Sequence, residues 1–486
     1  MYEITKKSSI YIFIAFIFLL VSSIINKNFI INGLFLLSIV AACGVTKSDS
    51  FYENIYYTLL ISSIFEYASY FPRHEKLYYF HIMLVICFIA TAFYILINRH
   101  ELRKIDKKAV YFYTVWFIYI CLSFFWSKSK DLNIKYIEIY AMMFAFVFIV
   151  VTFNTSKEKF YNSLKVVGFV FLLTVVIGMI ESITGTLLPV KHYFDDIMNK
   201  LTLKEIIVLR SRPVVFFFNA NNYATFLGLG IPFLMYLFYY VKTKAGKLFF
   251  GIATILTFTA LVLTNSRSNI LAVVLIFAVY TLVILKEGRL KALIYPLLIA
   301  VAFTGVYRYS YMMVKHGAEY EQKMIEKMAK IGDVAKMSKS DIGEEGSENV
   351  RATIIYDVVV EGFVKDKRLF GFGAGNTIQH LMDMNNTHGI YSPHGLATEM
   401  IGDFGLFTIV YGVFYLYLLY SLLLIALRQD GMNKFTAYSL LTSLIGFSIG
   451  SFSPSSVTYF LPNYVLFALS VSFIQVNKIK GSRLYE

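Results

Sequence analysis

Residues 248–285 read LFFGIATILTFTALVLTNSRSNILAVVLIFAVYTLVIL, two apolar runs joined by only a few polar residues. Each run is long enough to cross the roughly 30 Å hydrocarbon core of a bilayer as an α-helix. The sequence therefore predicts two membrane spans that meet in a tight turn at one membrane surface. Arg267 lies in that turn. Because its guanidinium is always charged, we expect it to have an anionic partner there.

The rest of the chain repeats this pattern, with 57% hydrophobic residues and 46 phenylalanines among 486 residues. Such a composition excludes a water-soluble core protein and indicates an all-α polytopic membrane protein. Apolar stretches of spanning length lie at 9–26, 28–45, 51–70, 77–98, 109–126, 135–153, 162–184, 214–241, 247–265, 267–286, 291–309, 404–427, 434–451 and 457–476. Because one stretch is short and another carries two glutamates, we expect about 12–14 transmembrane helices.

The positive charges indicate the orientation of these spans. If both termini are cytoplasmic, 22 of the 45 lysines and arginines fall in short inner connectors and only seven in short outer ones. This is the asymmetry that the positive-inside rule describes. The net charge of +14 is then explained by orientation and by contact with anionic membrane lipids, and we expect no nucleic-acid partner.

Two outer connectors are much longer than the others and divide the chain. The predicted segments are N-terminal helices in 1–184, an outer loop in 185–213, core helices in 214–309, a large extracytoplasmic loop in 310–402 and C-terminal helices in 403–486. The large loop is too long for a mere linker. In it, residues 320–336 have helical periodicity and predict an amphipathic helix. This helix would rest on the outer leaflet or cap the bundle, or it would be a solvated helix packed on a neighbouring loop. A second helical pattern runs from Arg351 to about Val364.

The first candidate site lies around Pro213, which we expect to open a helix. Arg210 and Arg212 precede this proline, and their planar guanidinium groups suit phosphate oxygens. They equally suit a structural role, snorkelling to lipid headgroups. Three asparagines of the following span indicate a polar cavity, because unpaired amides are costly in a membrane; they are Asn219, Asn221 and Asn222.

Arg267 and Arg351 form the next candidates, with the same two interpretations. The glycine-rich residues 371–376 follow Arg351, and we interpret them as a structural turn, because a lone Gly-x-Gly-x-Gly outside a strand-to-helix context is weak evidence for a nucleotide site. His394 lies just before the next span, near Tyr391. An imidazole suits proton abstraction near neutral pH.

His380 and His388 are equal candidates for the base on chemistry alone. The sequence has no Asp-x-Asp, His-Glu-x-x-His or Cys/His cluster to hold a divalent ion, and we expect neither a metal nor another cofactor. The residues then describe a transfer in which arginines neutralise a departing lipid diphosphate and one base takes a proton from an attacking sugar hydroxyl.

The spacing of these residues over about 205–407 resembles the O-antigen ligase and Wzy-type polymerase superfamily, including its teichuronic acid polymerase branch. Arg212 precedes Asn219-Ala-Asn221 by seven residues, where the family has Asn-Pro-Asn. Ser266-Arg267 begins a helix, and Arg351 lies about twenty residues before Gly371-Phe-Gly373. Pro393-His394-Gly395 is followed by Asp403 and Gly405, although the family has asparagine in place of Gly395.

The resemblance implies a GT-C-like membrane glycosyltransferase in the bacterial cytoplasmic membrane that uses undecaprenyl-diphosphate-linked glycans as donor and acceptor. A flippase and a chain-length co-polymerase would be further partners. By this resemblance Arg212 and Arg267 bind the diphosphate, Arg351 assists, and His394 activates the acceptor. Asn385, Asn386 or Tyr391 would orient the histidine or a sugar in place of the missing asparagine.

Polymerase and ligase share these residues, so the motifs do not separate the two activities. Heavy use of Ile, Lys, Asn, Tyr and Phe suggests an AT-rich genome, common in Gram-positive bacteria, and favours a polymerase of a wall, capsular or exported polysaccharide. The alternatives are a ligase that places a finished glycan on a lipid or wall acceptor, a lipid-linked oligosaccharide flippase, and a polysaccharide-binding scaffold in which His394 is dispensable.

Overall fold

The structure, a computed structural model, describes residues 6–24, 34, 48–65, 68–71, 74–190, 192, 210, 212–288, 301, 305, 342–344 and 346–478. The predicted spans at 28–45 and 291–309 lie almost wholly outside these residues. The predicted amphipathic helix at 320–336 lies entirely outside them. Every other predicted span falls on an observed helix.

The described chain is an all-α membrane bundle, as the sequence predicts. Eight of its helical segments are long and apolar enough to cross a membrane, and two more apolar helices are slightly shorter. The bundle helices are α1 (Lys6–Ile24), α3 (Ser48–Phe65), α4 (Tyr79–Ile97), α5 (Lys107–Leu122), α6 (Lys130–Phe153), α7 (Lys157–Thr184), α10 (Ala220–Tyr240), α11 (Lys244–Leu263), α12 (Arg267–Lys286), α18 (Thr408–Arg428), α19 (Gly431–Gly450) and α20 (Leu461–Val476).

Short elements join some of these helices. Strands β1 (Tyr70–Phe71) and β2 (His74–Tyr78) form a small antiparallel pair between α3 and α4. The 3₁₀ turns η2 (Arg99–Lys104) and η3 (Ser123–Phe125) flank α5. Several bundle helices start at a polar side chain that accepts hydrogen bonds from the first free backbone N–H groups, the usual N-cap arrangement; these caps are Asp106, Ser129, Ser156, Asn219 and Thr243.

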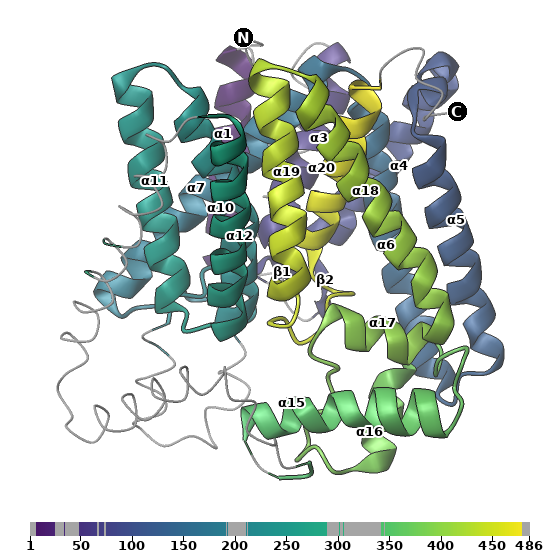
Figure 1. Ribbon diagram of the computed structural model, residues 1–486. Helices are drawn as coiled ribbons and strands as arrows, with labels where there is room; N and C mark the ends of the chain where they lie inside the picture. Colours follow the sequence, from purple (N-terminus) through teal and green to yellow (C-terminus); the bar gives the residue numbers. More distant parts are fainter. Residues whose placement is uncertain are drawn as a thin grey trace.

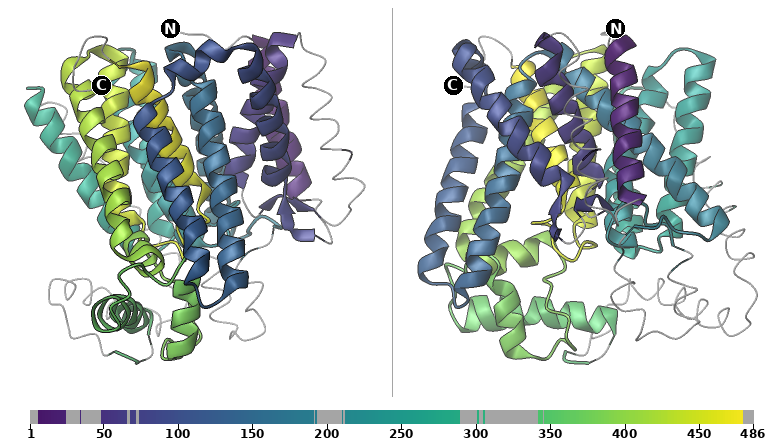
Figure 2. Two further views of the ribbon diagram at one scale, coloured as in Figure 1. Left: turned by 90° about the vertical axis from the view of Figure 1, so that its right-hand side faces the viewer. Right: turned by 180° about the vertical axis from the view of Figure 1, so that it is seen from behind.

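Helix α10 is central to the half of the bundle that carries Arg212 and Arg267. It packs against α7, α11, α12 and α19, and α19 also packs against α12 and α18. Gly446 of α19 permits the close approach to α12, since a Cβ atom there would lie 2.7 Å from the Ile276 side chain. The start of α1 and the end of α20 lie at one end of the bundle (Figures 1 and 2).

A helical segment from the predicted large loop lies across the opposite end, which we call the α15 end (Figure 1). Its elements are α15 (Ser347–Ile355), the π-helix η7 (Tyr356–Lys365), α16 (Asn376–Met384), α17 (Leu396–Phe404) and the 3₁₀ turn η8 (Gly405–Phe407). Lys128 forms a salt bridge of 2.7 Å to Asp383, and the Tyr119 hydroxyl donates to the Phe370 carbonyl at 2.9 Å. These contacts fix the segment to the ends of α5 and α6.

Two predicted helix starts are wrong. Pro213 does not open a helix: the chain turns through residues 214–219, and α10 begins at Ala220 with Asn219 as its N-cap. Arg351 lies inside α15, which starts four residues earlier, at Ser347. The predicted end near Val364 is close to the observed end of η7 at Lys365.

Candidate functional site

Three candidate side chains from distant parts of the sequence lie near one another at the α15 end. Arg267 is the first residue of α12, Arg351 lies in α15, and His394 immediately precedes α17. Burial and the positive charge of nearby Arg267 lower the pKa of the Arg351 guanidinium. Two guanidinium groups that repel each other form a ready site for an anion.

His394 is held in a defined and partly buried position. Its backbone φ of 44° is left-handed, which is uncommon for a residue other than glycine. The His394 N–H donates to the Ser455 carbonyl at 3.2 Å, and its Nε2 lies 3.0 Å from the Ser392 hydroxyl. Gly395 follows with a φ of 140° and lies so close to Phe452 that a Cβ atom would be 2.9 Å from that ring.

The second ring nitrogen of His394 has the features of a proton acceptor. Within the described chain, Nδ1 is buried and has no hydrogen-bond partner. The tautomer that donates Nε2–H to Ser392 leaves a lone pair on Nδ1. Burial and the charge of Arg351 lower the pKa of His394 to about 4, so the imidazole is neutral at physiological pH. An unpaired buried nitrogen is destabilising by about 1–3 kcal/mol unless a ligand supplies its partner.

A pH profile tests whether His394 acts as the base. A neighbouring cation disfavours the imidazolium form, and we therefore expect the acid limb of kcat/KM, which reports the free enzyme, to lie near pH 4. An anionic diphosphate bound beside Arg351 offsets that charge, and the acid limb of kcat should lie at higher pH. Rates measured from pH 3.5 to 9 check both limbs. Two coincident limbs at the ordinary imidazole pKa, about 6.5, would contradict the geometry.

Arg212 is placed by a buried carboxylate. Glu181, near the end of α7, accepts hydrogen bonds from the N–H groups of Val214 and Val215 at 2.9 Å and of Leu188 at 2.8 Å. These bonds fix the chain next to Arg212, which is partly buried at the α15 end, while Arg210 is exposed. The structure thus places Arg212 at the same end as the other candidates, with Glu181 determining its backbone position.

The three asparagines occupy the first turn of α10 and have different surroundings. The Asn219 side chain accepts from the Asn222 N–H at 2.9 Å, which is the capping contact. The Asn221 carbonyl accepts from the Thr225 hydroxyl at 3.0 Å. Within the described chain, the buried Asn222 Oδ1 has no hydrogen-bond partner. Of the three, Asn222 therefore has a free acceptor for a ligand.

The glycine-rich residues 371–376 form a structural turn, as expected. The Asp403 carboxylate accepts from the Gly375 N–H at 2.7 Å, the Thr377 N–H at 3.0 Å and the Thr377 hydroxyl at 2.6 Å. Gly373 donates to the Asp403 carbonyl at 3.0 Å. The N–H groups of this turn thus bind the start of the next span, and they are not directed at a ligand.

The other aromatic and histidine candidates make contacts of their own. Tyr391 packs on the small apolar cluster of α15, η7 and α16, and its hydroxyl donates to Asn385 at 3.2 Å. The His380 Nε2 contacts the Asp357 carbonyl at 3.1 Å, and the His388 Nε2 contacts the Gly343 carbonyl at 2.9 Å. The side chain that contacts Nε2 of the His394 ring is Ser392, a residue that the sequence analysis did not single out.

Sequence reasoning assigned no role at the site to Glu181, to Glu399 or to the turn at 451–458. Ser453 in this turn bonds to Ser266, the residue before Arg267, with 2.6 Å between the hydroxyl oxygens. The signal was visible: Ser-Phe-Ser-Pro-Ser-Ser-Val-Thr interrupts two apolar runs. Within the described chain, no group of three His, Cys, Asp or Glu side chains gathers as a metal site would require.

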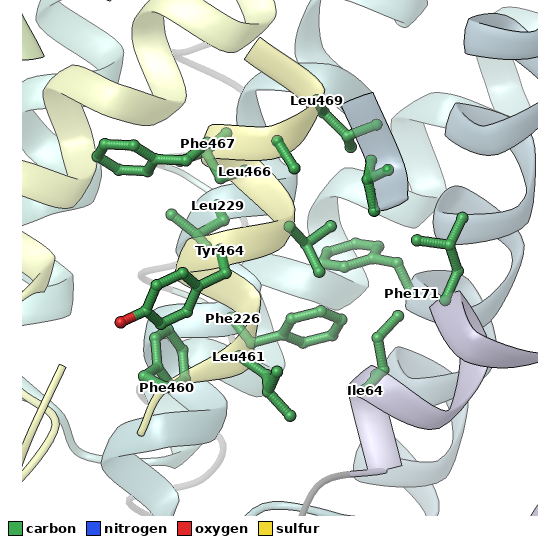
Figure 3. Packing of buried hydrophobic residues seen from close by; sticks show 14 of the residues in the cluster. Ile64, Phe171, Phe226, Leu229, Phe460, Leu461, Tyr464, Leu466, Phe467 and Leu469 are labelled. Carbon is green, nitrogen blue, oxygen red and sulfur yellow. The ribbon is translucent and has the colours of Figure 1, made fainter. Parts of the chain in front are cut away.

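An apolar cavity of about 430 Å³ lies between α7, α10, α19 and α20, away from these polar groups. Figure 3 shows Phe171, Phe226 and Leu229 among the side chains at this place, with Leu466 and Leu469 on α20. Arg267, Arg351 and His394 are not among its lining residues. The cavity suits hydrocarbon, whereas the candidate polar residues lie at the α15 end.

The fold is that of a polytopic helical membrane protein, and the candidate arginines and histidine lie together at one end of it. Residues 252–413 match the O-antigen ligase family, a stretch that contains Arg267, Arg351 and His394. The chain is 26% identical over 467 residues to the teichuronic acid biosynthesis protein TuaE of Bacillus subtilis (strain 168), covering 93% of this chain and 89% of that protein. These matches support a relationship of this chain to the O-antigen ligase/Wzy-like superfamily. They also support a polysaccharide polymerase- or ligase-type function.

Proposed function

We propose that the protein polymerises undecaprenyl-diphosphate-linked oligosaccharide units at the outer face of the bacterial cytoplasmic membrane, with the α15 end facing outward. The observation that supports it is the proximity of Arg267, Arg351 and His394. Cations that repel one another favour a bound diphosphate, and a neutral imidazole beside them favours removal of a proton from a hydroxyl. A flippase and a co-polymerase are the partners that such a reaction would use.

In the proposed step, a hydroxyl oxygen of the acceptor glycan attacks the anomeric carbon of the donor. A new glycosidic C–O bond forms as the bond between that carbon and the diphosphate oxygen breaks. The hydroxyl proton passes to Nδ1 of His394, and the undecaprenyl diphosphate leaves with the bonding electron pair. Arg267 and Arg351 stabilise the negative charge that develops on it, an electrostatic contribution that is often the largest in such reactions.

Other features at the α15 end and within the bundle support the same substrate. Arg212, fixed by the contacts of Glu181 with its neighbours, would provide a further cation for the diphosphate. Asn222 has a free buried oxygen that suits a sugar hydroxyl. The apolar cavity beside α10 would hold part of the hydrocarbon tail. A lipid with a long tail, a diphosphate and a polar glycan needs all three environments.

Ligase activity is the second candidate, because the matching family is that of O-antigen ligase. A ligase would use the same cations and imidazole, but it would transfer a finished glycan once to a different lipid or wall acceptor. The relative is named for teichuronic acid biosynthesis, which is compatible with either activity. The number of transfers per acceptor therefore separates the two activities.

Turnover of a purified lipid-diphosphate oligosaccharide by the purified protein tests the proposal. We expect a ladder of products separated by one repeat unit, formed equally in the presence of a metal chelator. A single transferred block would show a ligase, and no product would favour transport. Loss of activity in chelator that Mg²⁺ restores would contradict the chemistry proposed for the arginines.

A further inference from the structure

The turn at residues 451–458, between α19 and α20, contacts the residue before Arg267 and the backbone of His394. Ser453 bonds to Ser266, the N-cap of α12, with 2.6 Å between the two hydroxyl oxygens. Two residues later, the Ser455 carbonyl accepts from the His394 N–H at 3.2 Å. One short turn therefore links the start of the Arg267 helix to the backbone of His394.

Glu399 holds residues 456–458 of this turn by hydrogen bonds. Its side chain is 1% exposed and accepts from the Ser456 hydroxyl at 2.6 Å, the Thr458 hydroxyl at 2.7 Å and the Val457 N–H at 2.8 Å. These three donors satisfy both oxygens of the buried carboxyl group and so hold the turn against α17. The carboxylate belongs to α17, the helix that begins two residues after His394.

The contacts therefore form a closed ring. It runs from His394 along α17 to Glu399, across to the turn, and back through Ser455 to His394. Phe452 of the turn adds a further contact, because its phenyl group lies so close to Gly395 that a Cβ atom there would be 2.9 Å away. The left-handed φ of 44° at His394 costs about 1–3 kcal/mol and persists only where the surroundings enforce it. The contacts of the 451–458 turn hold His394 in this conformation.

We propose that Glu399 is a positioning residue that holds His394 in place through the 451–458 turn, and that Ser453 of this turn places Arg267 relative to His394. This inference rests on the proposed function, since the turn would set the distance between the base and a diphosphate-binding cation. Sub-ångström placement matters for such a step, because a displacement of about 1 Å can lower the rate a hundredfold. Neither residue touches the reacting atoms in this account.

Glu399→Gln tests the first half of the proposal. An amide has only one oxygen, so one of the three buried donors loses its partner. We expect kcat to fall by about ten- to a hundredfold, with the KM for the lipid donor changing less than about threefold. The acid limb of kcat/KM should also move to higher pH, because the imidazole is no longer held in its buried place beside Arg351. An unchanged kcat and an unchanged limb would overturn the proposal.

Ser453→Ala tests the second half, because it removes the link to Ser266 and leaves the Glu399 contacts intact. It should raise the KM for the donor and leave the acid limb in place, whereas an unchanged KM would contradict the role of Ser453. Matched controls are Glu101→Gln, a buried glutamate that accepts from Lys104 at 2.8 Å near the start of α5, and Ser470→Ala, whose hydroxyl bonds within α20. Both should keep wild-type kinetics.

A chemical measurement keeps this test separate from the proposed function. Acylation of His394 by diethyl pyrocarbonate, followed by mass spectrometry, reports the accessibility of the ring without any turnover. We expect severalfold faster acylation in Glu399→Gln than in the wild type; equal rates would overturn the positioning role. If Glu399→Gln fails to fold, Ser456→Ala removes one donor to the same carboxylate and is read in the same way. A wild-type protein that yields no transfer product would refute the function alone.

Discussion

Replacing His394 with alanine should lower the turnover number for glycan transfer by about 10²- to 10⁴-fold, the usual contribution of a positioned general base. The physical reason is the free Nδ1, which is buried beside Arg351 and has no partner within the described chain. The measurement is the rate of product formation from a purified lipid-diphosphate glycan at saturating donor, with the KM determined separately.

His388→Ala is the matched control for this substitution. His388 lies in the same segment, is exposed, and contacts the Gly343 carbonyl through Nε2. We expect it to retain wild-type turnover and the His394 variant to retain donor binding and normal amounts in the membrane. Normal chain length from the His394→Ala protein would remove the base from the mechanism and favour a scaffold.

Arg267→Lys should be nearly as damaging, although it keeps the charge. A guanidinium offers a planar fork that contacts two phosphate oxygens at once, whereas an ammonium acts as a single point. Loss of one preset donor to a developing negative charge lowers kcat by about 10²- to 10³-fold in other enzymes, and we expect a loss near the lower value. The measurement is again kcat and KM for the lipid donor.

Arg368→Lys provides the comparison, because Arg368 is exposed in the loop after η7. Its replacement should leave both constants unchanged. The competing interpretation of Arg267 is a side chain that only reaches lipid headgroups, a role that lysine fills equally well. Wild-type activity in Arg267→Lys would therefore support that interpretation and remove Arg267 from diphosphate binding.

The helices of the bundle were predictable because hydropathy alone determines where a chain can cross a membrane. The residues at which these helices begin and end were harder to predict. Pro213 is a typical first residue of a helix, yet the chain turns beyond it because the Glu181 carboxylate holds the Val214 and Val215 N–H groups in a non-helical turn. A contact between residues 33 positions apart is not visible in a local pattern.

The candidate residues of the site could be chosen from the sequence, whereas the contacts that hold them could not. Arginines in the outer connectors and a histidine before a span draw attention because such groups are costly near a membrane. What holds them is tertiary: Ser392 beside the His394 ring, Glu399 across the 451–458 turn, and Ser453 against Ser266. Serines and glutamates of this kind resemble ordinary polar residues until the fold brings them together.

The most direct test of the account is a cryo-EM structure of the His394→Ala protein, in which substrate accumulates unreacted, with an undecaprenyl-diphosphate oligosaccharide bound. We predict that the diphosphate oxygens lie within hydrogen-bond distance, about 2.7–3.2 Å, of the Arg267 and Arg351 guanidinium groups, with the anomeric carbon facing the space left by the imidazole. A diphosphate bound at the opposite end of the bundle, or one that touches neither arginine, would contradict it.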